Sequence, residues 1–139
     1  MTERRLKPGE IAIFSRKSEL VENIQNALQS QGIECKPLTK DTDITAADAV
    51  YVGTMHRAKG LEFKEVFVAD VSSDIVPLQY ALKQSKDTQD FKEALQREKQ
   101  LLYVSITRAR DEVFITWTGS PSEFLAEIID KQKRPVAVY

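Results

Sequence analysis

The sequence contains one cysteine and one histidine, Cys35 and His56, among 139 residues. A single cysteine excludes an internal disulfide and fits a reducing compartment, so we expect a cytoplasmic protein. The same scarcity argues against a structural zinc site, which takes four ligands from cysteine, histidine and acidic side chains. We therefore expect no bound metal in this chain.

Long apolar runs and an excess of charge of one sign are also missing. No stretch approaches the roughly 20 apolar residues that span a bilayer, and the charged N-terminus lacks the apolar segment of a secretory signal. We expect no membrane partner. The formal net charge is −1, so no global positive field draws the chain to nucleic acid, and any DNA contact must be local.

What remains is an ordinary globular composition, with 42% hydrophobic and 29% charged residues. The length suits a single domain over residues 1–139, with frayed tails at 1–9 and 131–139. Short β-branched or aromatic runs predict strands at 11–14, 33–38, 49–53, 65–71 and 112–117. Helical periodicity predicts helices at 19–31, from 90 to a turn at Asp111, and after 122. Such alternation predicts an α/β fold with a mostly parallel sheet and helices on both faces.

Three local features refine this outline. Ser18 is a plausible N-cap for the first helix. In the long helix, Glu98 is expected on the wet side, among other charged residues. The segment 40–48 holds Asp41, Asp43 and Asp48, but it lacks the glycine and closing glutamate of a calcium loop, so we interpret it as a solvated connection.

Residues 100–110, with the sequence QLLYVSITRAR, join a buried stretch to two arginines, Arg108 and Arg110. A guanidinium is always charged and offers a rigid fork of donors that fits phosphate. At the end of a packed helix it can be aimed at a fixed point, and we interpret Arg108 as aimed at a nucleotide phosphate. The alternative is a solvated helix end, since the helix dipole favours a cation there.

The ten residues TMHRAKGLEF lie between two predicted buried strands and hold four ionisable groups, His56, Arg57, Lys59 and Glu62. A loop that only connected strands would not need them. Loops at the edge of an α/β sheet are where such folds bind ligands. Gly60 would permit a backbone conformation or a close approach that a side chain forbids.

These stretches resemble known motifs. TMHRAKGLEF followed by EVFVAD resembles motif V of the superfamily 1 helicases of the UvrD/Rep group, and REKQLLYVSITRARDEVFIT resembles motif VI. The trailing GSPSEFLAEI is similar to the usual ending of that family, and IAIFSRKSEL resembles motif IV more loosely. The resemblance implies a second RecA-like motor domain, a three-layer sandwich.

The resemblance also implies roles on the nucleotide side. Arg108 would be the arginine finger that reaches the γ-phosphate of ATP. Arg16 would be a second γ-phosphate contact, Glu62 would contact the ribose, and Gly60 belongs to the same nucleotide-binding loop. The ATP, with Mg²⁺, would be bound mainly by an N-terminal RecA-like motor domain, in cis or in trans.

On the nucleic-acid side, the resemblance implies that Thr54 and His56 touch the backbone of single-stranded DNA. Arg57 and Lys59 are basic neighbours that could help, although Lys59 could equally be a surface charge. A second class of function stays open: a non-catalytic module that keeps the helicase fold and binds protein or nucleic acid without ATP.

The sequence departs from the family in what it lacks. It has no G-x-x-x-x-G-K-[ST] phosphate loop and no acidic pair placed to hold magnesium, so we expect no ATP hydrolysis by the chain alone. The accessory domain of full-length members is absent or very small, because Arg16 and Thr54 are close in sequence. The chain could be an excised domain or a naturally short protein. Either way, Arg16, Glu62 and Arg108 should be accessible to solvent rather than paired in the core.

Overall fold

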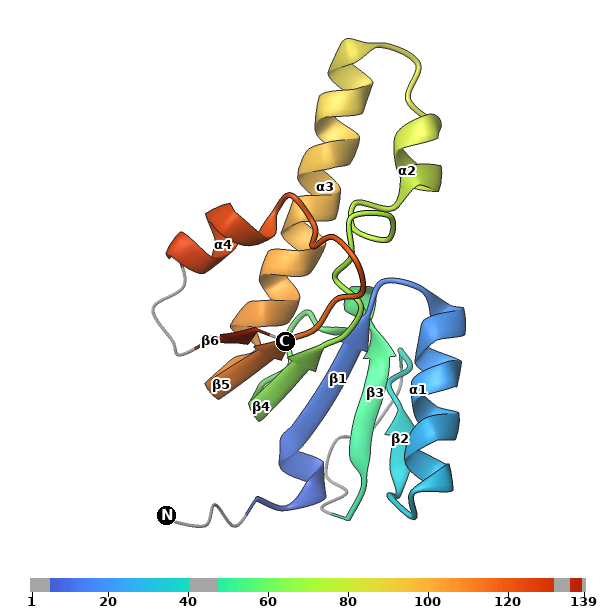
Figure 1. Cartoon of the computed structure of the whole chain (residues 1–139), viewed down its shortest axis with the longest axis vertical. Coiled ribbons are helices and arrows are strands. Elements are labelled where there is room, and N and C mark those ends of the chain that lie inside the picture. The colour runs from blue at the N-terminus through green and yellow to red at the C-terminus, as the bar shows by residue number, and fades with distance from the viewer. Residues whose placement is uncertain (1–5, 41–47, 132–135, 139) are drawn as a thin grey trace.

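A computed structural model describes residues 6–40, 48–131 and 136–138. Its centre is a six-stranded sheet in the order β2-β3-β1-β4-β5-β6, and every strand pair is parallel (Figure 1). The strands are β1 (Ile11–Ser15), β2 (Cys35–Pro37), β3 (Val50–Thr54), β4 (Phe63–Val68), β5 (Ala109–Ile115) and β6 (Val136–Val138).

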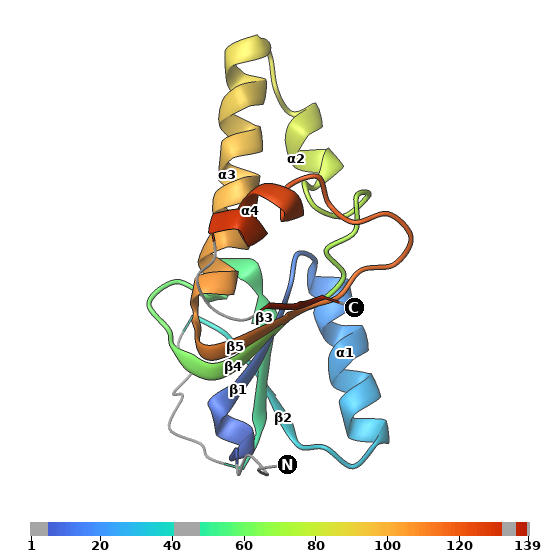
Figure 2. The same cartoon turned by 60° about the vertical axis from the view of Figure 1, so that its left-hand side comes forward.

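Helices cover both faces of this sheet. They are α1 (Ser18–Ser30), α2 (Gln79–Lys83), α3 (Thr88–Thr107) and α4 (Leu125–Lys131), with short 3₁₀ helices η1 (Pro8–Glu10) and η2 (Met55–Arg57). The two views show α1 on one face and α3 with α4 on the other (Figures 1 and 2). The predicted α/β fold, a three-layer sandwich with a parallel sheet, is confirmed.

Two hydrophobic cores separate the three layers, and the strand period of two explains them. In β1, Ala12 and Phe14 face the larger core, which includes Leu102 and Ile106 of α3. Ile11 and Ile13 of the same strand face the smaller core under α1. The short apolar runs of the sequence are therefore buried on both sides, as expected for central parallel strands.

The edges of the elements differ from the predictions in several places. The N-cap of α1 is Lys17, not Ser18, and no side chain caps this helix. The tail expected to be frayed at 131–139 differs in part, because β6 (Val136–Val138) pairs with β5. Of the three loop aspartates, Asp48 is exposed, and Asp41 and Asp43 lie outside the described residues.

A helical arm projects beyond the carboxyl ends of the strands (Figure 1). It consists of α2 and the first half of α3, whose start at Thr88 lies close to the predicted start at residue 90. Asp87 caps α3, its side chain accepting a hydrogen bond of 2.8 Å from the amide of Asp90. Because α3 begins in the arm and ends at the start of β5, it runs from beyond the carboxyl ends of the strands to their amino ends.

Candidate nucleotide and nucleic-acid site

The loop between β3 and β4 runs from the carboxyl ends of the strands to their amino ends. It begins at the carboxyl edge, where Thr54 lies beside Ser15 of β1 in the strand register. It ends at the opposite edge, where Phe63 opens β4 and its amide donates to the carbonyl of Arg108 at 2.9 Å. This loop therefore begins at the residues predicted to bind nucleic acid and ends beside the residues predicted to bind the nucleotide.

Arg108 lies at the C-cap of α3, and neutral oxygen atoms hold its guanidinium in place. Its Nε donates to the carbonyl of Val104 at 3.1 Å, its Nη2 to Oγ1 of Thr107 at 3.2 Å, and its Nη1 to the carbonyl of Leu61 at 3.5 Å. No carboxylate of the described ranges forms an ion pair with it. Arg108 is thus half-buried, oriented and not neutralised by a carboxylate there.

Glu62 and Gly60 lie at the same end of the loop as Arg108. Leu61, between them, supplies the carbonyl that Arg108 Nη1 reaches. Both Glu62 and Gly60 are exposed, as predicted for Glu62. The φ of Gly60 is +80°, a left-handed conformation that suits glycine. The structure therefore brings together three of the four residues predicted on the nucleotide side.

Arg16 is the fourth, and its predicted accessibility is wrong. It is 9% exposed and forms a side-on ion pair with Glu98 of α3, which is 4% exposed. Nε donates to Oε1 at 2.9 Å and Nη2 to Oε2 at 2.8 Å. The amide of Leu78 also donates to Oε1 of Glu98, at 2.7 Å. The expectation of Glu98 on the wet side is wrong for the same reason.

Arg16 contacts the middle of α3, at Glu98, whereas Arg108 lies at the C-cap of that helix. Glu98, which holds Arg16, precedes Arg108 by ten residues of continuous helix and cap, a rise of about 15 Å. Arg16 lines one hollow together with Thr54 and His56.

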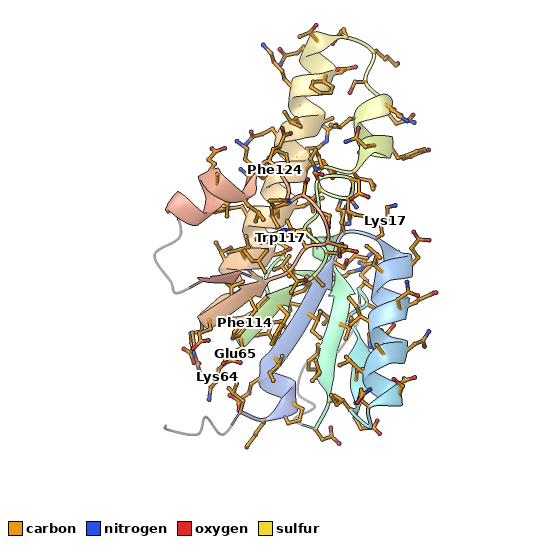
Figure 3. All side chains as sticks on the ribbon, viewed as in Figure 1. Lys17, Lys64, Glu65, Phe114, Trp117 and Phe124 are labelled. Atoms are coloured by element: carbon orange, nitrogen blue, oxygen red, sulfur yellow. The ribbon has the colours of Figure 1, made fainter. Side chains whose placement is uncertain are left out.

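Thr54, His56, Arg57 and Lys59 follow the carboxyl edge of the sheet. Thr54 is half-buried, and the other three are exposed. A hollow of about 540 Å³ opens here, and Arg16, Lys17, Ser18, Glu19, Thr54, His56, Arg57 and Leu78 line it. Lys17 lies at the start of α1 in Figure 3. We call Lys17, Thr54, His56, Arg57 and Lys59 the basic strip.

The imidazole of His56 has its pKa lowered from the ordinary value. Desolvation is the largest cause, followed by the positive charge of Arg16, while Glu98 opposes the shift and Arg57 adds to it. His56 is therefore neutral at pH 7. It can donate one N–H to an anion as a hydrogen bond, without adding a full positive charge.

The pH dependence of folding tests this environment. The unfolded chain binds the histidine proton more readily than the folded chain, so the stabilisation by neutral His56 is lost as the pH falls from 7 through the lowered pKa. We expect His56→Gln to flatten the drop in the free energy of unfolding between pH 7 and pH 5, with no difference between pH 7 and pH 8. Urea unfolding at each pH measures the free energy of unfolding. Identical pH profiles for the unaltered chain and His56→Gln would contradict a lowered pKa of His56.

Glu98 is the residue of this site that the sequence interpretation missed. Its signal was present, because it lies four residues after Ala94 and four before Leu102, both buried on one side of α3. A lone carboxylate on an apolar stripe requires a buried partner. The pattern did not say which of the 20 lysines and arginines would be that partner.

The described part of the chain has neither a membrane-spanning helix nor a metal-binding cluster. No helix there is long and apolar enough to cross a membrane. No group of three or more His, Cys, Asp or Glu side chains in that part could hold a metal ion.

The parallel α/β sandwich and the charged loop between β3 and β4 are consistent with a helicase C-terminal domain, the class that the family model identifies. The chain belongs to the family described as the UvrD-like helicase C-terminal domain, whose model matches residues 37–120. The match includes Thr54 to Glu62 and Arg108, whereas Arg16 lies outside it.

Individual relatives agree with this membership. The putative ATP-dependent DNA helicase YjcD of Bacillus subtilis is 31% identical over 99 residues, 66% of this chain and 13% of that protein. The ATP-dependent DNA helicase PcrA of Staphylococcus aureus is 37% identical over 100 residues, 62% of this chain and 13% of that protein. The chain thus spans about an eighth of the length of these relatives.

A solved structure supports the fold. It is the C-terminal domain of a possible DNA helicase from Lactobacillus plantarum WCFS1, with a TM-score of 0.61 and 23% identity. The similarity covers 93% of this chain and 66% of that one. At this identity it establishes the shared architecture alone.

Proposed function

We propose that this chain is the second motor domain of an ATP-dependent DNA helicase. In this function Arg108 is the arginine finger for ATP and Mg²⁺ that an N-terminal motor domain binds, and the basic strip carries single-stranded DNA. The observation that carries the proposal is the geometry of Arg108: three neutral oxygens orient it, and no described carboxylate neutralises it.

The chemistry of phosphoryl transfer supports the assignment of Arg108. Charge develops on the transferring phosphoryl group, and catalysis depends on cations that are already positioned when it does. A guanidinium anchored through Nε to Val104 needs little reorganisation to meet that charge. Gly60 and Glu62, exposed beside it, are available for the rest of the nucleotide.

The basic strip supports the assignment of single-stranded DNA as a ligand. The overall charge is −1, yet Lys17, Arg57 and Lys59 gather at one edge around the neutral donor His56. Phosphate contacts of this kind provide affinity without reading sequence. Because the loop that carries Thr54 to Lys59 continues to Gly60 and Glu62 beside Arg108, single-stranded DNA at one end and ATP at the other would share one loop.

The double variant Arg57→Glu with Lys59→Glu tests the strip. We expect weaker binding of a labelled oligothymidine, with the slope of log K against log salt reduced by about 0.7 for each phosphate that the variant no longer binds. Fluorescence anisotropy across a sodium chloride series measures both quantities. Lys83→Glu with Lys92→Glu, which reverses two positive charges on the exposed arm, is the matched control. Equal weakening in the two double variants would show a general charge effect and reject the strip.

A further inference from the structure

We infer that Thr107 is a positioning residue for Arg108 in ATP hydrolysis. The inference rests on the proposed function, in which Arg108 is the arginine finger. It assigns to the hydroxyl of Thr107 the task of holding the guanidinium in one plane, so that the remaining N–H groups of Arg108 are presented to the oxygens of a phosphate.

The end of α3 leaves one backbone carbonyl to side chains. The amide of Arg108 donates to the carbonyl of Ser105 at 3.3 Å, so the carbonyl of Val104, one turn back, receives no hydrogen bond from it. The last carbonyls of a helix generally lack backbone donors. At Val104, side chains supply them: Oγ1 of Thr107 donates to this carbonyl at 2.9 Å, and Nε of Arg108 donates to it at 3.1 Å.

The chemistry of the partners fixes the direction of each hydrogen bond at Thr107. A carbonyl oxygen only accepts, so the hydroxyl of Thr107 donates its hydrogen to Val104. A guanidinium only donates, so the same hydroxyl accepts from Nη2 of Arg108 at 3.2 Å. The three residues therefore form a closed ring of hydrogen bonds that holds the guanidinium at Nε and at Nη2.

This ring leaves part of the guanidinium available to a ligand. An arginine carries five N–H donors, and in Arg108 three of them have acceptors among the described residues: the carbonyl of Val104, the hydroxyl of Thr107 and the carbonyl of Leu61. The contact with Leu61 is the longest of the three, at 3.5 Å, so it constrains the plane least. The remaining donors, one on each terminal nitrogen, suit two oxygens of one phosphate.

Thr107 thus provides orientation and no charge. Without the hydroxyl, Arg108 keeps its charge and its Nε contact with Val104 but loses the contact that fixes the far end of the guanidinium. A cation that must reorient as charge develops stabilises the transition state less than one already in place. Thr107→Val removes the hydroxyl and keeps a β-branched side chain of nearly the same shape, so it isolates this contribution.

The first measurement uses this chain alone and tests the geometry without reference to its function. In proton–nitrogen NMR spectra, a guanidinium held in one plane gives separate signals for its terminal nitrogens, and a rotating one gives an averaged signal. The signals that disappear in Arg108→Ala identify this residue. We expect separate signals in the unaltered chain and in Thr107→Ser, which keeps the hydroxyl, and an averaged signal in Thr107→Val. Separate signals in Thr107→Val would overturn the positioning role.

The second measurement is ATP hydrolysis in PcrA of Staphylococcus aureus carrying residues 37–120 of this chain in place of the matching segment. We expect Thr107→Val to lower kcat by about tenfold with the KM for ATP unchanged, the pattern of a contact that counts only in the transition state. Thr107→Ser should restore turnover. Ser105→Ala is the matched control, because Oγ of Ser105 also donates to a carbonyl of α3, that of Leu101 at 2.8 Å, and does not contact Arg108.

A double variant separates positioning from general support of the helix end. In single-turnover hydrolysis, Thr107→Val should lower the rate no further once Arg108→Ala is present, because no guanidinium remains to be positioned. A further decrease of the same size, or an equal loss of turnover in Ser105→Ala, would overturn the inference. Circular dichroism checks that each variant is folded, and Thr107→Ala, which also lacks the hydroxyl, replaces Thr107→Val if that variant unfolds.

The failure of the inference and the failure of the proposed function give different results. Loss of turnover in Arg108→Ala with normal turnover in Thr107→Val would overturn the positioning role and leave the finger in place. Near-normal turnover in Arg108→Ala would overturn the finger and, with it, the catalytic purpose of Thr107, whatever the NMR spectra show of the guanidinium.

Discussion

Arg108→Ala is expected to lower ATP turnover by about 10³–10⁵-fold in an enzyme that pairs this domain with a complete ATP-binding domain. A suitable enzyme is the PcrA helicase of Staphylococcus aureus in which residues 37–120 of this chain replace the matching segment. The decrease follows because alanine removes the positive charge at the transferring phosphoryl group, and water cannot replace a preorganised cation. Steady-state ATP hydrolysis with saturating single-stranded DNA measures the effect.

Arg110→Ala is the matched control for this experiment. Arg110 is two residues away, its side chain is 52% exposed, and its Nε lies 3.7 Å from a carboxylate oxygen of the neighbouring Asp111. We expect its removal to leave turnover within a few-fold of the unaltered chimera. Near-normal turnover with Arg108→Ala would reject the finger and favour the non-catalytic binding module. The isolated chain, which lacks a phosphate loop, is expected to show no turnover with or without DNA.

Removal of one partner of the buried Arg16–Glu98 pair is expected to have the largest effect on stability. Glu98→Ala leaves a buried guanidinium and the amide of Leu78 without their acceptor, and such a change costs about 3–5 kcal/mol of unfolding free energy. Replacement of both partners by apolar residues, Arg16→Met with Glu98→Leu, should recover most of that stability, because no uncompensated charge remains. Urea unfolding followed by circular dichroism measures each variant.

The ion pair between Lys99 and Glu127 provides the comparison. It has nearly the same separation, 2.9 Å, but both side chains are partly exposed, 28% and 45%. Lys99→Ala is expected to cost no more than about 1 kcal/mol. A cost for Glu98→Ala as small as that for Lys99→Ala would mean that water replaces the buried carboxylate, and the pair would add little to stability.

The sequence by itself determined the features that depend on local periodicity. Apolar runs such as Ile11–Phe14 specified buried parallel strands, because residues two apart share a face whatever the rest of the chain does. The helical stripe that ends at Ile106 likewise placed Arg108 at a helix end. The motif resemblance indicated the family, and the matched range of 37–120 agrees with it.

Tertiary structure decided the features that join distant segments. Arg16 and Glu98 are 82 residues apart, and neither local pattern contains information about the other, so an expected exposed arginine became a buried ion pair. The strand β6 formed because β5 offered it a free edge, not because of its own short sequence. The lowered pKa of His56 has the same origin: its causes, desolvation and the charges of Arg16 and Glu98, exist only when α3 lies against η2.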